Sequence, residues 1–138
     1  MRRHLDWEVR LGAYLDDVRY TPHAYGRHDC ILFTANGVKA QTGKDHARGM
    51  RGKYRSAASS VRFLRSLGYD DTAALVTAKL GESILPSFAQ RGDVVMTAEG
   101  AVGICMGATA FFVGQEGDRP GLLTVPRREW TKAWRVGE

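Results

Sequence analysis

The spacing of apolar residues changes along the chain, and this change limits the possible fold more than any other feature. Before Pro86, apolar residues recur every three or four positions, which is typical of helices packed on one face. After Gly92-Asp93, short β-rich runs are separated by glycine turns, which is typical of an antiparallel sheet. Helices followed by an antiparallel sheet predict an α+β domain, with N-terminal helices packed on a C-terminal sheet.

The first two helices are marked by their end signals. One is predicted over about residues 6–20, where Thr21-Pro22 ends it. The next is predicted over about residues 30–41, with Gly43 as its C-terminal cap. Residues 21 to 29 form the turn between them.

Two further helices are predicted after a loop over residues 44–56. The third helix is expected to place Val61, Leu64 and Leu67 on one face and to end at Gly68. A short fourth helix follows, capped by Asp70 or Asp71 and ended by Gly81.

The strands are short and their order is simple. Runs at 94–96, 101–106, 111–113 and 122–125 predict a meander, with a Gly/Asp/Pro-rich loop before the last of them. Residues 134–136 are a candidate edge strand.

Length and composition are those of one ordinary domain. The chain has 138 residues, so we expect a single domain over 1–138. Its two cysteines, Cys30 and Cys105, are too few for a disulfide scaffold. Residues 1–8 are basic and lack the apolar run of a signal peptide. No run of 18 apolar residues suggests a membrane span. We therefore expect synthesis in a cytoplasm, with any later exit by lysis or by packaging into a particle.

The net charge of +5 is concentrated in one segment. Five basic residues and one acid, Asp45, lie between positions 44 and 55, a local balance of +4. The basic residues are Lys44, Arg48, Arg51, Lys53 and Arg55. Such a segment is either a docking surface for an anionic partner or a solvated loop.

The turn before the second helix carries the residues with the most chemistry. The run is Tyr25-Gly26-Arg27-His28-Asp29-Cys30, and an apolar helical pattern follows at once. Asp29 is a candidate N-cap, and Cys30 then occupies the first turn. Free N–H groups and the helix dipole favour a thiolate there, and they can lower a cysteine pKa below about 8.5. The alternative is an inert, half-buried cysteine behind a structural cap.

These motifs resemble those of the NlpC-like cell-wall cysteine peptidases, which have a compact papain-related fold. The family's aromatic-Gly-x-x-Asp-Cys stretch matches Tyr25 to Cys30, with Phe33 one turn later. Its first strand matches Gly92-Asp93-Val94-Val95, and its second strand matches residues 101–107. The resemblance implies an NlpC-like fold and a cysteine nucleophile at position 30.

Two further runs resemble an uncharacterised branch of this superfamily found in tailed phages, prophages and bacteria. They are Arg51-Gly52-Lys53-Tyr54 and, near the C-terminus, Ala133-Trp134-Arg135-Val136. This likeness covers nearly the whole chain and implies a tail-associated protein encoded in a phage or prophage gene cluster. Its location would be the host cytoplasm during assembly and the virion tail afterwards.

The chain departs from the family at the catalytic base. The histidine that opens the family's second strand is replaced by Ala101. The polar residue that orients that histidine falls near Phe112 or Val113, which are both apolar. A thiol without a base and an orienting group lacks the arrangement that activates it in such enzymes.

Other residues are candidates for the missing role. His28 is a possible base, although residues two apart at a helix start generally point to different faces. His23 lies on the same turn, and His46 lies in the basic loop. Cys105 either faces Cys30 across the helix–sheet interface or packs in the core. No ligand spacing supports a metal site, and we expect no cofactor.

Two functions of different classes remain open: Ala101 favours the first, and the retained Asp29-Cys30 at the helix start favours the second. The first is a structural or assembly protein of a phage tail, with a degenerate peptidase-like domain that contacts other tail proteins. The second is an active thiol amidase or endopeptidase on cell-wall peptide that uses Cys30. Peptidoglycan is a possible partner. Nucleic acid is a partner only in a third, weaker interpretation that takes the basic loop as its footprint, because no recognised binding motif accompanies that loop. The candidate substrate- or partner-binding residues are Tyr25, Arg48, Arg51, Lys53 and Tyr54.

Overall fold

The computed structural model describes residues 1–116 and 118–137. Within these residues, four α-helices precede a five-stranded antiparallel sheet, so the α+β prediction is confirmed. The helices are α1 (Trp7–Val18), α2 (Cys30–Thr42), α3 (Ala57–Ser66) and α4 (Thr72–Leu80). The strands are β1 (Val94–Thr97), β2 (Val102–Cys105), β3 (Thr109–Glu116), β4 (Arg119–Pro126) and β5 (Trp130–Trp134). Two short 3₁₀ helices, η1 (Pro86–Phe88) and η2 (Arg127–Glu129), lie beside the strands.

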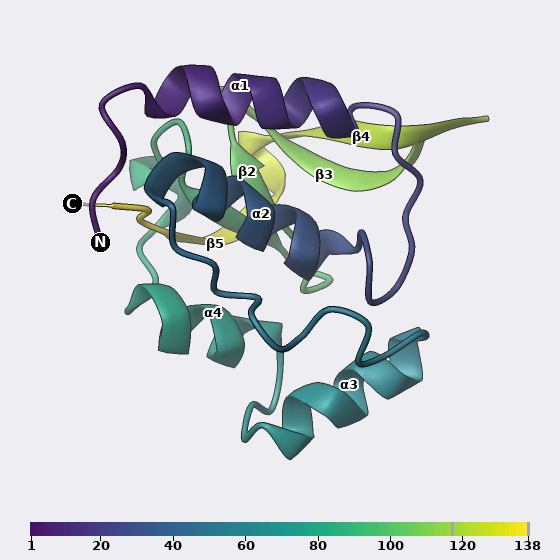
Figure 1. Ribbon diagram of the computed structural model, residues 1–138. Coiled ribbons are helices and arrows are strands. Elements are labelled where there is room, and N and C mark those ends of the chain that lie inside the picture. Colours follow the sequence, from purple (N-terminus) through teal and green to yellow (C-terminus); the bar gives the residue numbers. More distant parts are fainter. Residues whose placement is uncertain (117, 138) are drawn as a thin grey trace.

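The sheet has the strand order β4-β3-β2-β1-β5, so the last strand returns to lie beside the first. Figure 1 shows α1 and α2 across one face of the sheet, while α3 and α4 lie together at one end of the molecule. Helix α2 is the central element, because α1 contacts one side of it and strands β2 and β3 contact another. The fold thus places the start of α2 between the sheet and the α3–α4 end.

A glycine lets α2 approach the sheet closely. A side chain at Gly37 would overlap the Ile104 side chain on β2. Leu32 and Phe33, on the same helix, are fully buried, as expected for a helix covered on several sides. The close contact between α2 and β2 sets the position of the N-terminus of α2 relative to the first residues of β2.

The predicted helix ends agree with the structure, but the predicted apolar face of α3 is wrong. Asp29 caps α2, Gly43 ends it in the left-handed conformation, and Asp71 caps α4. On α3 only Leu64 is buried, whereas Val61 and Leu67 are 45% and 48% exposed. The helix packs along a narrow strip because its neighbours are a loop and a second short helix rather than the sheet.

The loop predicted before residue 122 is mostly strand. Strands β3 and β4 pair without interruption from Thr109↔Pro126 to Glu116↔Arg119, while residue 117 lies outside the described residues. Pairing across the hairpin outweighs the turn preference of Gly114 and Gly121, which face each other. The last strand also begins four residues earlier than predicted and pairs with β1, from Trp134 opposite Val94.

Candidate functional site

Cys30 is the first residue of α2, and Asp29 is the N-cap, as predicted. The Asp29 side chain accepts a hydrogen bond from the backbone N–H of Leu32 at 2.9 Å. One of the free N–H groups at the helix start is therefore already paired with a carboxylate oxygen.

The second oxygen of Asp29 holds a distant loop in place. It accepts the Tyr54 hydroxyl at 2.7 Å and the Gly26 backbone N–H at 3.0 Å. The Gly52 N–H also donates to the Gly26 carbonyl at 2.8 Å. Asp29 and Tyr54 are both buried. The Tyr25–Cys30 turn and the Arg51–Tyr54 run, which are separated by the whole of α2, are thus joined at one carboxylate.

The environment of the Cys30 thiol favours its protonated form. Burial raises the thiol pKa above its ordinary value, and the neighbouring Asp29 carboxylate raises it further. Hydrogen bonding from the backbone of Val102 and Ile31 acts in the opposite direction without reversing the shift. The expected lowering of the pKa by the helix N-terminus is therefore outweighed by burial.

The four histidines lie elsewhere. The His28 ring packs edge-on against Phe33, with 5.9 Å between ring centroids, and burial lowers its pKa. His23 packs edge-on against Tyr25 at 4.5 Å, and the His46 Nε2 lies 3.4 Å from the Met1 sulfur. His4 lies at the other end of α2, where its N–H donates to the Gln41 carbonyl. Within residues 1–116 and 118–137, no hydrogen bond joins a histidine to the Cys30 thiol.

The positions that correspond to the base and the orienting residue in the resemblance to NlpC-like peptidases are occupied by packing residues. Ala101 is half-buried and packs against a cluster that contains Phe112, which is itself buried. Cys105 belongs to the same cluster, on the face of the sheet opposite to α2. The suggestion that Cys105 faces Cys30 is therefore wrong, and core packing is its role. Among the described residues, no three His, Cys, Asp or Glu side chains are grouped to hold a metal ion.

The candidate binding residues fall into two groups. Arg51 and Tyr54 are engaged within the protein: Arg51 donates to both oxygens of Asp45 at 2.9 Å and to Asn36 at 2.6 Å. This guanidinium holds the pKa of Asp45 below its ordinary value. Tyr25, Arg48 and Lys53 are exposed, so only these three are available for contact with another molecule.

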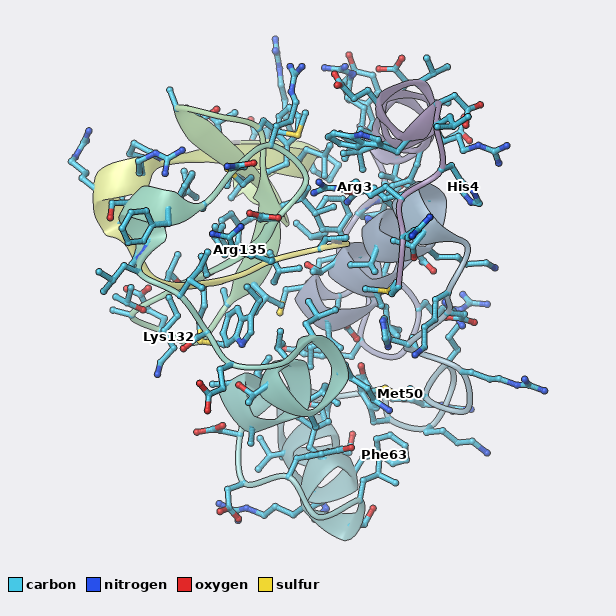
Figure 2. The ribbon with its side chains drawn as sticks, turned by 90° about the vertical axis from the view of Figure 1, so that its left-hand side faces the viewer. Arg3, His4, Met50, Phe63, Lys132 and Arg135 are labelled. Atoms are coloured by element: carbon cyan, nitrogen blue, oxygen red, sulfur yellow. The ribbon has the colours of Figure 1, made fainter. Side chains whose placement is uncertain are left out.

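A groove that sequence reasoning missed lies beside the start of α2. It encloses about 400 Å³ between the α3–α4 connection and the β1–β2 turn. Ile31 lines it, together with charged residues that include Asp70, Glu99 and Lys132. Lys132 is labelled in Figure 2 on the sheet side of this region. The groove residues come from five separate segments, so no sequence spacing could have indicated it.

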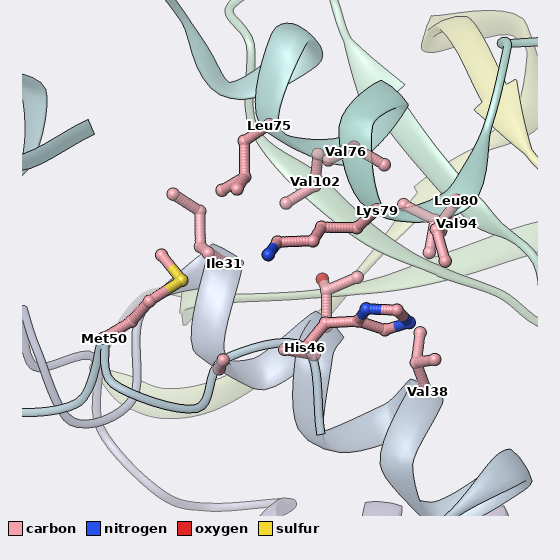
Figure 3. A pocket seen from close by; sticks show the side chains of 13 residues that line it. Ile31, Val38, His46, Met50, Leu75, Val76, Lys79, Leu80, Val94 and Val102 are labelled. Carbon is pink, nitrogen blue, oxygen red and sulfur yellow. The ribbon is translucent and has the colours of Figure 1, made fainter. Parts of the chain in front are cut away.

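A second, smaller cavity lies further along α2. Figure 3 shows Ile31, Met50 and Leu75 on one side of it and the Lys79 side chain extended across it. Its volume is about 50 Å³ and its lining is almost entirely apolar. That space holds only a few atoms, so it is not a site for a peptide or a glycan.

The fold and the site together define an α+β domain whose central helix begins at a cysteine beside a buried carboxylate. This chain belongs to the family DUF6950, described as a domain of unknown function, which it matches over residues 2–136. No curated protein matches the sequence. Among the described residues, none of the helices has the length and apolar character needed to cross a membrane.

Proposed function

We propose that this protein is a non-catalytic relative of the NlpC-like cysteine peptidases that serves as a structural or assembly component of a phage or prophage tail. The observation that supports this most strongly is the residue in the place of the base: Ala101 is half-buried and packs against the cluster that contains Phe112. The charged neighbour of Cys30 is the Asp29 carboxylate, which is held by Leu32, Gly26 and Tyr54.

The chemistry of thiol hydrolases explains why the missing base matters. Such enzymes need a thiolate, which a nearby imidazolium stabilises. Loss of a general base typically reduces the rate by about 10²–10⁴. At Cys30, burial and the carboxylate act in the same direction, toward the neutral thiol.

The residues that resemble the phage branch support an architectural role. Trp134 is fully buried, and its indole N–H donates to the Thr77 hydroxyl at 3.1 Å. Val136 N–H donates to the buried Asp93 carboxylate at 3.0 Å. The terminal run therefore joins the edge of the sheet to α4 and to the Gly92-Asp93 motif, which maintains the fold without supplying any reactive group.

An exposed apolar pair supports contact with a neighbouring protein. Leu85 and Phe88, at η1 beside strand β5, are 65% and 59% exposed. Large apolar side chains that lie together at the surface are typical of protein–protein contacts. Other tail or tail-tip proteins are the partners we propose for this part of the surface.

A second candidate function is an active thiol amidase or endopeptidase on cell-wall peptide. Two observations favour it: Cys30 is the first residue of a helix and is only half-buried, and the groove lined by Ile31 lies beside it. In this reading Cys30 is the nucleophile, and peptidoglycan is the substrate.

The rate at which iodoacetamide alkylates Cys30 is expected to rise with pH. It should stay below half of its maximum until the pH exceeds about 8.5, the pKa of a free cysteine. The reason is the raised pKa of this thiol, which keeps it protonated at neutral pH. The measurement is the alkylation rate of the Cys105→Ala variant between pH 5 and 10, with Cys30→Ser as the blank. A rate that reaches its plateau below pH 7 would contradict the non-catalytic proposal and favour the amidase.

Purified phage particles are expected to contain this protein at a fixed copy number. The measurement is quantitative mass spectrometry of particles produced from the gene cluster that encodes the chain. A Leu85→Ser, Phe88→Ser variant should fold normally but be depleted from particles, because it lacks the apolar pair. Absence of the unaltered protein from both particles and tail intermediates would contradict the tail assignment.

A further inference from the structure

The positive charge of the molecule is concentrated at one end. Residues 44–69 contain seven basic residues and one acidic residue, a balance of +6, whereas the whole chain has a net charge of +5. The remaining residues therefore carry a net charge of −1. Figures 1 and 2 place α3 and the loop before it at the same end of the molecule, where Phe63 and Met50 are labelled.

Ion pairing removes part of this charge and leaves the rest at the surface. Arg51 is neutralised by Asp45, and Lys44 lies at the far end of the loop, after α2. The five other basic side chains are exposed, and none forms an ion pair within the described part of the chain. These five residues lie on the loop before α3 or on α3 itself, and we call them the α3 basic surface: Arg48, Lys53, Arg55, Arg62 and Arg65.

The loop and the helix are held together as one unit. Tyr54 packs on Phe63 with 5.7 Å between ring centroids, and Ser56 and Ser59 form a capping box at the start of α3. On α3, Arg62 and Arg65 are three residues apart, so they are neighbours on the helix surface, and both are exposed whereas Leu64 is buried. The position of these arginines is therefore fixed by the fold rather than by a free loop.

The nearest acidic residues in the sequence line the groove. Asp70 and Asp71 do so together with Ser60, Val61 and Leu64, whereas neither Arg62 nor Arg65 lines it. Neither carboxylate forms an ion pair with a residue of the α3 basic surface in the described part of the chain.

We propose that the α3 basic surface binds the phosphate backbone of double-stranded DNA without reading its sequence. Four of its five cations are arginines, whose planar guanidinium groups fit phosphate oxygens in pairs. Neutralised phosphates release condensed counterions, and this release supplies most of the affinity in sequence-independent binding.

The two aromatic residues within the loop and α3 favour a duplex over other anionic partners. Tyr54 is buried and Phe63 is half-buried against it, so neither is free to stack on the bases of a single strand. Protein partners are usually held by aromatic anchors at the centre of an interface, and neither of these two side chains is exposed. This inference does not depend on the state of Cys30 or on the tail assignment.

The test is fluorescence anisotropy of a labelled 20-base-pair duplex of mixed sequence, titrated with the full chain at several salt concentrations. Five phosphate contacts predict a slope of log K against log salt of about −4.5, which is a loss of affinity of roughly 500-fold between 50 and 200 mM salt. The Arg62→Gln, Arg65→Gln variant is expected to bind more weakly, with a slope of about −2.7 and a loss of roughly 40-fold over the same range.

The matched control is Arg128→Gln, Arg135→Gln, which removes the same charge from exposed arginines that form no ion pair in the described structure. It should bind as the unaltered protein does. Thermal melting checks that both double variants fold. If the Arg62→Gln, Arg65→Gln variant unfolds, Lys53→Gln is tested in its place.

Three results would overturn the proposal. They are no binding of the duplex at 50 mM salt, an equal loss of affinity in the α3 and control variants, and equally effective competition by polyglutamate of matched charge. Tighter binding of a single strand of the same length would overturn the assignment to duplex DNA.

Discussion

Replacing Asp29 with alanine is expected to lower the free energy of unfolding by about 3–5 kcal/mol. The carboxylate is buried and accepts three hydrogen bonds, from Leu32, Gly26 and Tyr54. Its removal leaves the Tyr54 hydroxyl and the Gly26 N–H buried without their partner. The loss of an N-cap adds about 0.5–2 kcal/mol. This expectation follows from the structural role that we assign to the aspartate beside the cysteine.

Urea denaturation of a short series of variants measures this contribution. Tyr54→Phe removes one donor and should cost about 1.5–3 kcal/mol, the range for a hydrogen bond to a charged group. Asp71→Ala is the matched control, because Asp71 caps α4 through an exposed bond to the Ala74 N–H. We expect about 1 kcal/mol for that cap. Equal costs for Asp29→Ala and Asp71→Ala would show that the link to Tyr54 contributes nothing.

Replacing Gly26 with alanine is expected to cost about 3–4 kcal/mol, for two reasons that add. Gly26 has φ +81°, a left-handed conformation that costs an alanine roughly 1–2 kcal/mol. The new methyl group would also overlap the backbone carbonyl oxygen of Tyr54. A backbone atom cannot move aside as a flexible side chain can, so relief of this overlap must displace the loop.

Gly49→Ala separates these two costs. Gly49 has φ +84°, but no atom lies within 4 Å of the position that its methyl group would take. The control should therefore cost only the conformational term, about 1–2 kcal/mol. The measurement is again the free energy of unfolding in urea. A Gly26→Ala variant as stable as Gly49→Ala would mean that the turn does not press against the Tyr54 loop.

The sequence alone determined the features that depend on neighbouring residues. The start of α2 at Cys30, its cap at Asp29 and its end at Gly43 were predictable, because caps act over only three or four residues. The change from helices to an antiparallel sheet was predictable because the spacing of apolar residues and the glycine turns are also local features of the sequence. The sequence also placed Ala101 where the resemblance to NlpC-like peptidases predicts a histidine, because that comparison needs only the order of the motifs.

Only the tertiary structure decided which distant groups meet. It paired Tyr54 with Asp29 and Arg51 with Asp45, placed His28 against Phe33, and turned Cys105 away from α2. It also decided the direction in which the pKa of the Cys30 thiol is shifted. The dipole of the helix start and the preceding Asp29 are both local, but burial of the thiol depends on packing from the whole chain, and burial has the largest effect on this pKa.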